Sequence, residues 1–391
     1  MLILKLAFKN IRGAGLRTWL NVIALSFGYV AIIFIQGLIN GMTHQMEASN
    51  INAYYGGGQY WQQKYDPYDP LTLDFAHGKV PTDFQQLVDE DKALPILIRQ
   101  ATIYPKGRMQ SAVLKGIKPN QKVITIPAYV LNEVNGYIPG LIGERMAKNT
   151  GLSKGDVLTV RWRDTHGTYD ANEVKIVEVM STNVMEIDNG QIWIPIDKMR
   201  EMTAMPDEAT MFVLGKNSKF NKSLFGWNFK SLDFLLEDTR AAMEVEQAGD
   251  SLFYIVLLVL AMLSIFDTQI LSIFRRRKEM GTLMALGMTR SNLIRLFTIE
   301  GAMHAILAAV AAAIYGTPLL LWVYSSGIAM PGGASDSFGL SIGDAIHPIF
   351  SAGLIIGTTL IILMVTTIVS YLPTRKISRL KPTDALRGKL T

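Results

Sequence analysis

Four long apolar stretches stand out from the mixed pattern of the rest of the chain. They cover residues 20–42, 251–274, 298–324 and 349–372. Each is about as long as the roughly 20 helical residues that a bilayer core requires. The pattern therefore predicts four transmembrane helices, with one before and three after a long segment that also contains many polar residues.

That long segment, residues 43–250, carries both strand-like and helix-like spacing. Three β-rich runs bounded by turn residues predict strands, at 157–163, 173–180 and 190–196. Polar and apolar residues at helical spacing predict short helices, at 82–92, 143–150 and 197–204. The fold class predicted is an α-helical membrane protein with four transmembrane helices in a 1+3 arrangement and a large α+β extracytoplasmic domain.

The end of the long segment predicts a helical stalk. Residues 231–250 are helix-permissive, contain no proline and lead directly into the second apolar stretch. A continuous helix of about 45 residues would be roughly 65–70 Å long, more than twice the hydrocarbon thickness. Such a rod could transmit a displacement from one side of a membrane to the other.

Charge sets the expected orientation, because short loops rich in lysine and arginine stay in the cytoplasm. The 391-residue chain has a net charge of +5, and lysine and arginine far outnumber aspartate and glutamate in residues 1–19, 275–297 and 373–391 but not in residues 43–250. We therefore expect an inner-membrane protein with both ends cytoplasmic. The cytoplasmic parts are an interfacial helix (1–19), the segment 275–297 and the tail 373–391; the domain 43–250 and the loop 325–348 lie outside. No basic patch elsewhere indicates nucleic acid.

The segment between the second and third spans has a distinctive pattern. Four consecutive basic residues follow the apolar run, and Met280, Leu283, Met284 and Leu286 then cluster at helical spacing. Gly287 is suited to end that helix in the left-handed conformation. The pattern predicts a cytoplasmic hinge that offers a docking surface to a soluble partner.

Three sequence segments resemble the transmembrane subunits of the MacB, LolC and FtsX class of ABC transporters. They are RRRKEMGTLMALGMTRSNLIRLFTIEG at 275–301, PTRKISRLKPTDALRG at 373–388 and LIGERMAKNTGLSKGDVLTV at 141–160. The resemblance implies a non-catalytic permease subunit that docks a cytoplasmic ABC ATPase and pairs with a second copy or a paralogue. The coupling segment it implies comprises Glu279, Met280, Gly281, Leu283, Met284, Ala285, Leu286 and Gly287.

The sequence offers no site for catalysis, a cofactor or a metal. No G-x-x-x-x-G-K-[ST] run that could wrap a phosphate occurs, and Gly388-Lys389 lacks the rest of that pattern. There is no cysteine and no H-E-x-x-H motif, and the five histidines are dispersed. We therefore expect ATP and Mg to bind a partner ATPase.

An aromatic and glycine-rich run follows the first span. Tyr54, Tyr55, Tyr60 and Trp61 surround three consecutive glycines. One interpretation is an interfacial aromatic belt or a turn at the base of the outer domain. The other is a contact for a cargo or a partner. This run and Gly116-Ile117-Lys118-Pro119 resemble elements of the lipoprotein-releasing LolC/LolE branch, which favours lipoproteins as the cargo.

The predicted function is coupling of ATP hydrolysis to work outside the membrane, in the first place lipoprotein release. The alternatives are a MacB-like efflux subunit with a periplasmic adaptor and an FtsX-like signalling subunit that controls a cell-wall hydrolase. A stand-alone channel is disfavoured, because Asp267 and Glu300 are the only acidic residues within the last three spans and form no polar stripe. Glycine pairs at Gly37/Gly41 and Gly353/Gly357 predict close helix packing.

Overall fold

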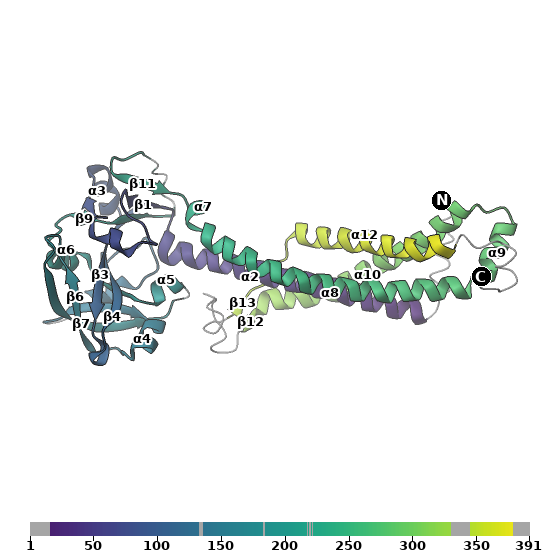
Figure 1. Ribbon diagram of the computed structural model, residues 1–391, viewed down its shortest axis with the longest axis horizontal. Coiled ribbons are helices and arrows are strands. Elements are labelled where there is room, and N and C mark those ends of the chain that lie inside the picture. Colours follow the sequence, from purple (N-terminus) through teal and green to yellow (C-terminus); the bar gives the residue numbers. More distant parts are fainter. Residues whose placement is uncertain are drawn as a thin grey trace. The chain divides into compact units, whose positions relative to one another are not determined.

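The computed structural model describes residues 16–132, 136–182, 184–216, 218, 220, 222–329 and 345–377. The interfacial helix predicted near the amino end, most of the carboxyl-terminal tail and most of the loop 325–348 lie outside these residues. The described chain divides into two compact units, which Figure 1 shows. We call residues 16–42, 243–329 and 345–377 the helical unit, and residues 43–242 the β-rich unit.

The helical unit consists of long helices that pack side by side (Figure 1). They are α2 (Leu16–Asn50), α8 (Glu237–Arg275), α10 (Arg290–Ser326) and α12 (Ala352–Ile377), with the short α9 (Arg277–Ala285) between α8 and α10. Their shared core contains Tyr29 of α2, Ala308 of α10 and Ile362 of α12, with Leu258 of α8 against it. The strands β12 (Ile328–Ala329) and β13 (Ala345–Ile346) pair beside α10.

Among the described residues, three helices are long and apolar enough to cross a membrane: Trp19–Tyr55, Arg290–Ser326 and Ala352–Arg375. These contain the predicted spans 20–42, 298–324 and 349–372 apart from a few terminal residues. The remaining predicted span, 251–274, is helical backbone within α8. Several of its side chains lie outside the described residues, so a fourth span stays a prediction.

The small residues in α2 allow a close approach of another part of the helical unit. A Cβ atom on Gly41 would lie 2.2 Å from the carbonyl oxygen of His347, and one on Gly37 would lie 2.2 Å from the Phe350 ring. The Ile349 amide also donates to the Gly37 carbonyl at 2.8 Å. Gly37 and Gly41 therefore pack within this chain, whereas nothing lies within 4 Å of a Cβ placed on Gly357.

This contact gives a first prediction. We expect Gly41→Ala to destabilise the helical unit by roughly 1–3 kcal/mol, because its methyl group would overlap the backbone of residue 347. Thermal unfolding of the solubilised protein measures the effect. Gly357→Ala is the matched control and should leave the melting temperature unchanged or slightly raised, since alanine favours the helix. Equal melting temperatures for the two variants would contradict the packing.

The β-rich unit is built on a nine-stranded mixed sheet of order β11-β1-β10-β3-β4-β8-β5-β7-β6. β3 (Ala93–Ile103) also pairs with β6 at Ala101–Ile103, so the six strands from β3 to β6 close into a barrel. The first half of β3 pairs instead with β10, which extends the sheet. The other strands are β1 (Gln59–Gln62), β4 (Gln110–Ile117), β5 (Ile138–Gly143), β6 (Val157–Arg163), β7 (Tyr169–Met180), β8 (Gln191–Pro195), β10 (Met211–Leu214) and β11 (Trp227–Lys230); β2 (Gly78–Lys79) pairs with β9 (Glu208–Ala209).

The predicted elements of this unit are present with shifted ends. The strand predicted at 157–163 is β6, and its burial alternates strictly, as expected for a strand with one face on the core. The predicted helices are α3 (Thr82–Asp89), α4 (Glu144–Thr150) and α6 (Ile196–Thr203). The sequence did not show that β3 is long enough to serve two partners and close a barrel. Short helical turns fill the connections: η2 (Pro70–Asp74), η3 (Pro105–Gly107), η4 (Ala128–Leu131) and α5 (Met185–Asp188).

The predicted stalk is interrupted once. The Ser231 side chain caps the start of α7 (Leu232–Leu235) by accepting from the Phe234 amide. A turn at Leu236 separates α7 from α8. From Glu237 onward α8 is one helix of 39 residues, which corresponds to a length of about 58 Å. The uninterrupted helix is therefore shorter than the predicted rod.

Candidate functional site

The hinge between α8 and α10 is closed by local backbone chemistry. α9 ends in a Schellman motif: the Met288 amide donates to the Leu283 carbonyl, and the Gly287 amide donates to the Met284 carbonyl. Gly287 has a φ of +97°, which a glycine adopts without strain. The Thr289 hydroxyl then caps α10 by accepting from the Asn292 amide. The chain thus reverses direction between two capped helices.

A small apolar core holds the two arms of this hinge together. Met280 of α9 is only 3 % exposed and packs with Leu293 and Phe297 of α10. Leu283 and Met284 are half-buried against the same cluster. The burial of Met280 therefore does not support its prediction as part of a docking surface, and Gly281 is buried as well.

An ion pair adds to this core. Arg276, just before α9, donates from Nη1 to both carboxylate oxygens of Glu300 at 3.1 Å. The Glu300 side chain is 6 % exposed and the Arg276 side chain 24 %. The guanidinium also lies 5.3 Å from the Phe297 ring centre and contacts the exposed Glu279 at 2.8 Å. Arg276 thus ties the start of α9 to the interior of α10.

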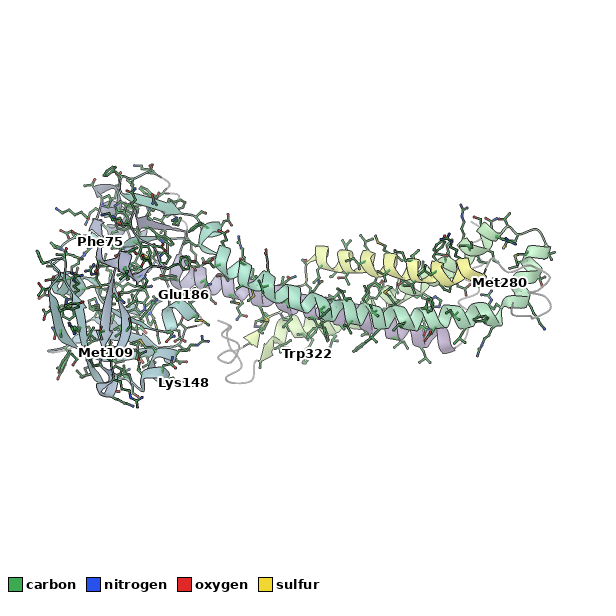
Figure 2. All side chains as sticks on the ribbon, in the orientation of Figure 1. Phe75, Met109, Lys148, Glu186, Met280 and Trp322 are labelled. Atoms are coloured by element: carbon green, nitrogen blue, oxygen red, sulfur yellow. The ribbon has the colours of Figure 1, made fainter. Side chains whose placement is uncertain are left out.

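What remains on the surface of the hinge is the far end of α9. Leu286 is 80 % exposed, and Thr282, Ala285 and Gly287 beside it are exposed too. Figure 2 labels the buried Met280 of this helix. Of the predicted coupling residues, Glu279, Ala285, Leu286 and Gly287 are accessible to a partner, whereas Met280 and Gly281 support the hinge from inside.

A second candidate site lies in the β-rich unit. The π-helix η1 (Ile51–Tyr55) follows α2, and the three glycines after it let the chain lie against β10. Gly56 has a φ of +59°, and a Cβ there would lie 2.2 Å from the Leu214 carbonyl oxygen. Tyr54 and Tyr55 from η1 and Trp61 from β1 form part of the wall of a pocket of about 930 Å³. We call it the aromatic pocket.

Hydrogen bonds fix the wall of the aromatic pocket. The Trp61 indole N–H donates to the Gln59 side-chain oxygen at 2.7 Å, and the Gln59 amide group donates to the Tyr54 carbonyl at 2.9 Å. Among the other lining residues, the Tyr68 hydroxyl donates a hydrogen bond to the Asp238 carboxylate. This bond raises the pKa of Tyr68 to about 12, with burial and nearby carboxylates adding to the shift. These hydrogen bonds hold the residues that line the pocket in place.

Tyr60 does not line the aromatic pocket. It directly precedes Trp61 in β1, and successive side chains of a strand point to opposite faces of the sheet. Its side chain is fully buried in a different apolar cluster with Phe84 and Phe212, and its hydroxyl donates to the Lys222 carbonyl at 2.9 Å. The prediction of Tyr60 as a cargo or partner contact is thus not supported by its position. Tyr54, Tyr55 and Trp61 remain candidates.

Behind the wall lies a buried lysine, Lys115 of β4. It is 2 % exposed, and its Nζ donates to the Tyr54 hydroxyl at 2.9 Å and lies 5.1 Å from the Trp193 ring centre. Burial lowers the pKa of Lys115 to about 7, although Glu186 acts in the opposite direction. Lys115 therefore links β4 to η1 through an amine that is easily neutralised.

Sequence reasoning missed the partners that complete both sites. The sequence marks Glu300 as a rare acidic residue within a span, which is itself a signal of function, but it does not identify Arg276 as its partner. In the aromatic pocket, Glu186 of α5, Phe234 of α7 and Asp238 of α8 lie far in sequence from the aromatic run at residues 54–61, and no local pattern could have grouped them with it. Figure 2 labels Glu186. In the part of the chain that the structure describes, no three metal-binding side chains gather.

Comparison with known proteins finds similarity over part of the chain. Residues 251–382 match the family model of the FtsX-like permease C-terminal domain. The macrolide export ATP-binding/permease protein MacB of Burkholderia thailandensis is 27% identical over 165 residues, which cover 42% of this chain and 22% of that protein. The MacB protein of Burkholderia lata is 26% identical over 165 residues, covering 42% and 21%. The chain thus spans about a fifth of the length of these curated relatives.

Among solved structures, the extracellular domain of the noncanonic ABC-type transporter YknZ from Gram-positive bacteria aligns with 41% of this chain and 84% of its own. The identity is 14% and the TM-score 0.27, too low to establish a shared fold. The permease match and the MacB relatives support an ABC transporter permease of the MacB and FtsX class.

Proposed function

We propose that this chain is the membrane subunit that couples ATP hydrolysis on a partner ABC ATPase to movement of the β-rich unit. In this proposal the chain crosses the inner membrane four times, with residues 275–297 and both ends in the cytoplasm. The β-rich unit lies outside, ATP and Mg bind the ATPase, and a second permease copy or a paralogue completes the assembly.

The exposed end of α9 is the observation that carries the proposal. Leu286 presents an apolar side chain that is 80 % exposed, and the helix that carries it is held by a capped hinge and the Arg276–Glu300 pair. An exposed leucine alone is ordinary on a protein surface. On a rigid helix of a permease domain, it is suited to anchor a partner in an apolar recess.

Transmission would follow the continuous backbone. α8 begins at Glu237 beside the aromatic pocket, ends at Arg275 beside the hinge and contributes residues to both units. A displacement of the hinge by an ATPase would therefore act on a helix that also belongs to the β-rich unit. No conducting pore is needed for such work.

Two cargo classes remain in the proposal. The aromatic run and the Gly116–Pro119 element favour lipoprotein release, since acyl chains leaving a bilayer need shelter from water. Both curated relatives are described as macrolide exporters, which favours efflux of small molecules as the second candidate. Mass spectrometry of proteins that copurify with the tagged chain separates the two: bound lipoproteins support the first, and an adaptor without lipoproteins supports the second.

Docking is tested at Leu286. We expect Leu286→Asp to weaken ATPase association at least about tenfold, because a carboxylate would be desolvated in an apolar recess. Replacement of Glu279 should also weaken association, but less. The measurement is ATPase retained by the solubilised complex, together with ATP turnover.

Phe225→Asp is the matched control, because Phe225 is fully exposed on the β-rich unit. It should leave both ATPase retention and turnover unchanged. Retention of the ATPase by Leu286→Asp at the level of the unmodified chain would remove α9 from the proposed docking surface.

A further inference from the structure

The aromatic pocket has a chemistry that the proposed coupling does not use. Its volume of about 930 Å³ lies within the usual range for sites that hold small organic molecules. Tyr55, Trp61, Tyr65 and Phe234 line it with aromatic rings. Trp61 is edge-to-face with both Tyr65 and Phe234, at centroid separations of 5.2 and 6.0 Å. These contacts hold the rings in place.

The polar groups of the pocket are predominantly negative. Four carboxylates line it, Asp66, Glu186, Glu237 and Asp238, against the two ammonium groups of Lys64 and Lys230. Within the described residues, none of the four carboxylates forms an ion pair with a lysine or an arginine. Because carboxylates outnumber ammonium groups beside the apolar walls, the pocket favours an incoming cation.

Lys230 shows that the rings already stabilise a positive charge. Its Nζ lies 4.2 Å from the Phe234 ring centre and 5.1 Å from that of Trp61. Both distances fall within the range in which a cation is attracted to an aromatic face. Burial and the negative groups nearby raise the pKa values of Tyr55 and Tyr65, so these hydroxyls stay neutral and add no repulsive or attractive charge.

We propose that the aromatic pocket binds a monovalent organic cation with an apolar body, such as a tertiary or quaternary ammonium compound. The apolar body lies against Tyr55, Tyr65 and Trp61, and the cationic centre faces Glu186 and Asp238. An anion of the same shape is rejected by the same carboxylates. This site needs no ATPase, so its test is separate from that of the proposed coupling.

Binding is measured with the full chain in lipid nanodiscs by equilibrium dialysis. Tetraphenylphosphonium is the probe, and tetraphenylborate is its counterpart of nearly the same shape and opposite charge. Uptake by empty nanodiscs is subtracted for both ions. We expect saturable binding of tetraphenylphosphonium, at least about tenfold tighter than that of tetraphenylborate, since aromatic and carboxylate contacts both favour the cation.

The variant Glu186→Gln/Asp238→Asn tests the assignment to this pocket. Glu186 and Asp238 are exposed, and the amides keep the side-chain shapes, so the variant should fold. We expect tetraphenylphosphonium affinity to fall about tenfold, because two attractive charges are lost. Glu144→Gln/Glu173→Gln removes two exposed carboxylates outside the pocket and should leave the affinity unchanged.

Three results would overturn the inference. One is uptake of tetraphenylphosphonium that does not exceed uptake by empty nanodiscs. Another is equal or tighter saturable binding of tetraphenylborate, which would indicate an anion site. The third is equal affinity in the pocket variant and the control variant, which would place the cation elsewhere on the protein.

Discussion

Glu300→Ala is expected to release α9 from α10 at a cost of about 3 kcal/mol, because it leaves the Arg276 guanidinium without its buried partner. This value is at the lower end of the usual range, since the Arg276 side chain is 24 % exposed and retains Glu279. A change of that size corresponds to roughly a hundredfold shift in an opening equilibrium. The hinge would then open often enough to expose its apolar core.

The absence of cysteine in this chain allows a direct measurement. A single Met280→Cys thiol is placed at a position that is 3 % exposed, and its labelling rate by a maleimide reports opening of the hinge. We expect that rate to rise by up to about a hundredfold when Glu300→Ala is added. Leu286→Cys should label rapidly with or without that change, because Leu286 is already exposed.

Glu279→Ala is the matched control, since it removes the other carboxylate that contacts Arg276. The Glu279 side chain is 63 % exposed, so its loss should change the free energy of opening by less than about 1 kcal/mol. A rescue is also expected: replacing Arg276 and Glu300 together by methionine should restore slow labelling, because no buried charge is left unpaired. Fast labelling of Met280→Cys before any change at Glu300 would contradict a closed hinge.

The hinge illustrates what a helical pattern predicts and what it leaves open. Spacing correctly indicated an amphipathic helix ending near Gly287, because both features are local. The spacing did not reveal which residues cover the apolar face of α9. Leu293 and Phe297 cover Met280 within the same chain, so Leu286 is the one exposed residue of the apolar set Met280, Leu283, Met284 and Leu286. The direction of burial was decided by tertiary packing.

In the β-rich unit, too, the sequence predicts local elements but not the contacts between distant segments. Alternation along residues 157–163 was sufficient to predict β6, but the closure of β3 onto β6 depends on pairing between Thr102 and Arg161, which are far apart in sequence. The aromatic run was also a genuine signal. Strand alternation then places Tyr60 in the core while Trp61 lines the pocket. Glu186 and Asp238, which also line it, come from elements that no local pattern joins to this run.

Lys115 carries the second large expected effect, a rise in the stability of the β-rich unit with pH. The pKa of Lys115 is about 7 in the folded protein and close to 10.4 in an unfolded chain. Between these values the unfolded state holds a proton that the folded state lacks, so the free energy of unfolding increases with pH. The gain is about 2 kcal/mol between pH 7 and 9, a window below the titration of the neighbouring tyrosines.

Thermal unfolding followed by the infrared band of β-strands measures this gain, because the nine-stranded sheet belongs to the β-rich unit. Lys115→Met should raise the melting temperature at pH 7 and flatten its pH dependence, since it removes the desolvated charge. The unsatisfied Tyr54 hydroxyl offsets about 1 kcal/mol of that gain. Lys122→Met, at an exposed lysine, should preserve the full pH dependence. If Lys115→Met kept the same slope as Lys122→Met, another group would have to be responsible, and Lys115 would be a charged residue that the β-rich unit accommodates at neutral pH.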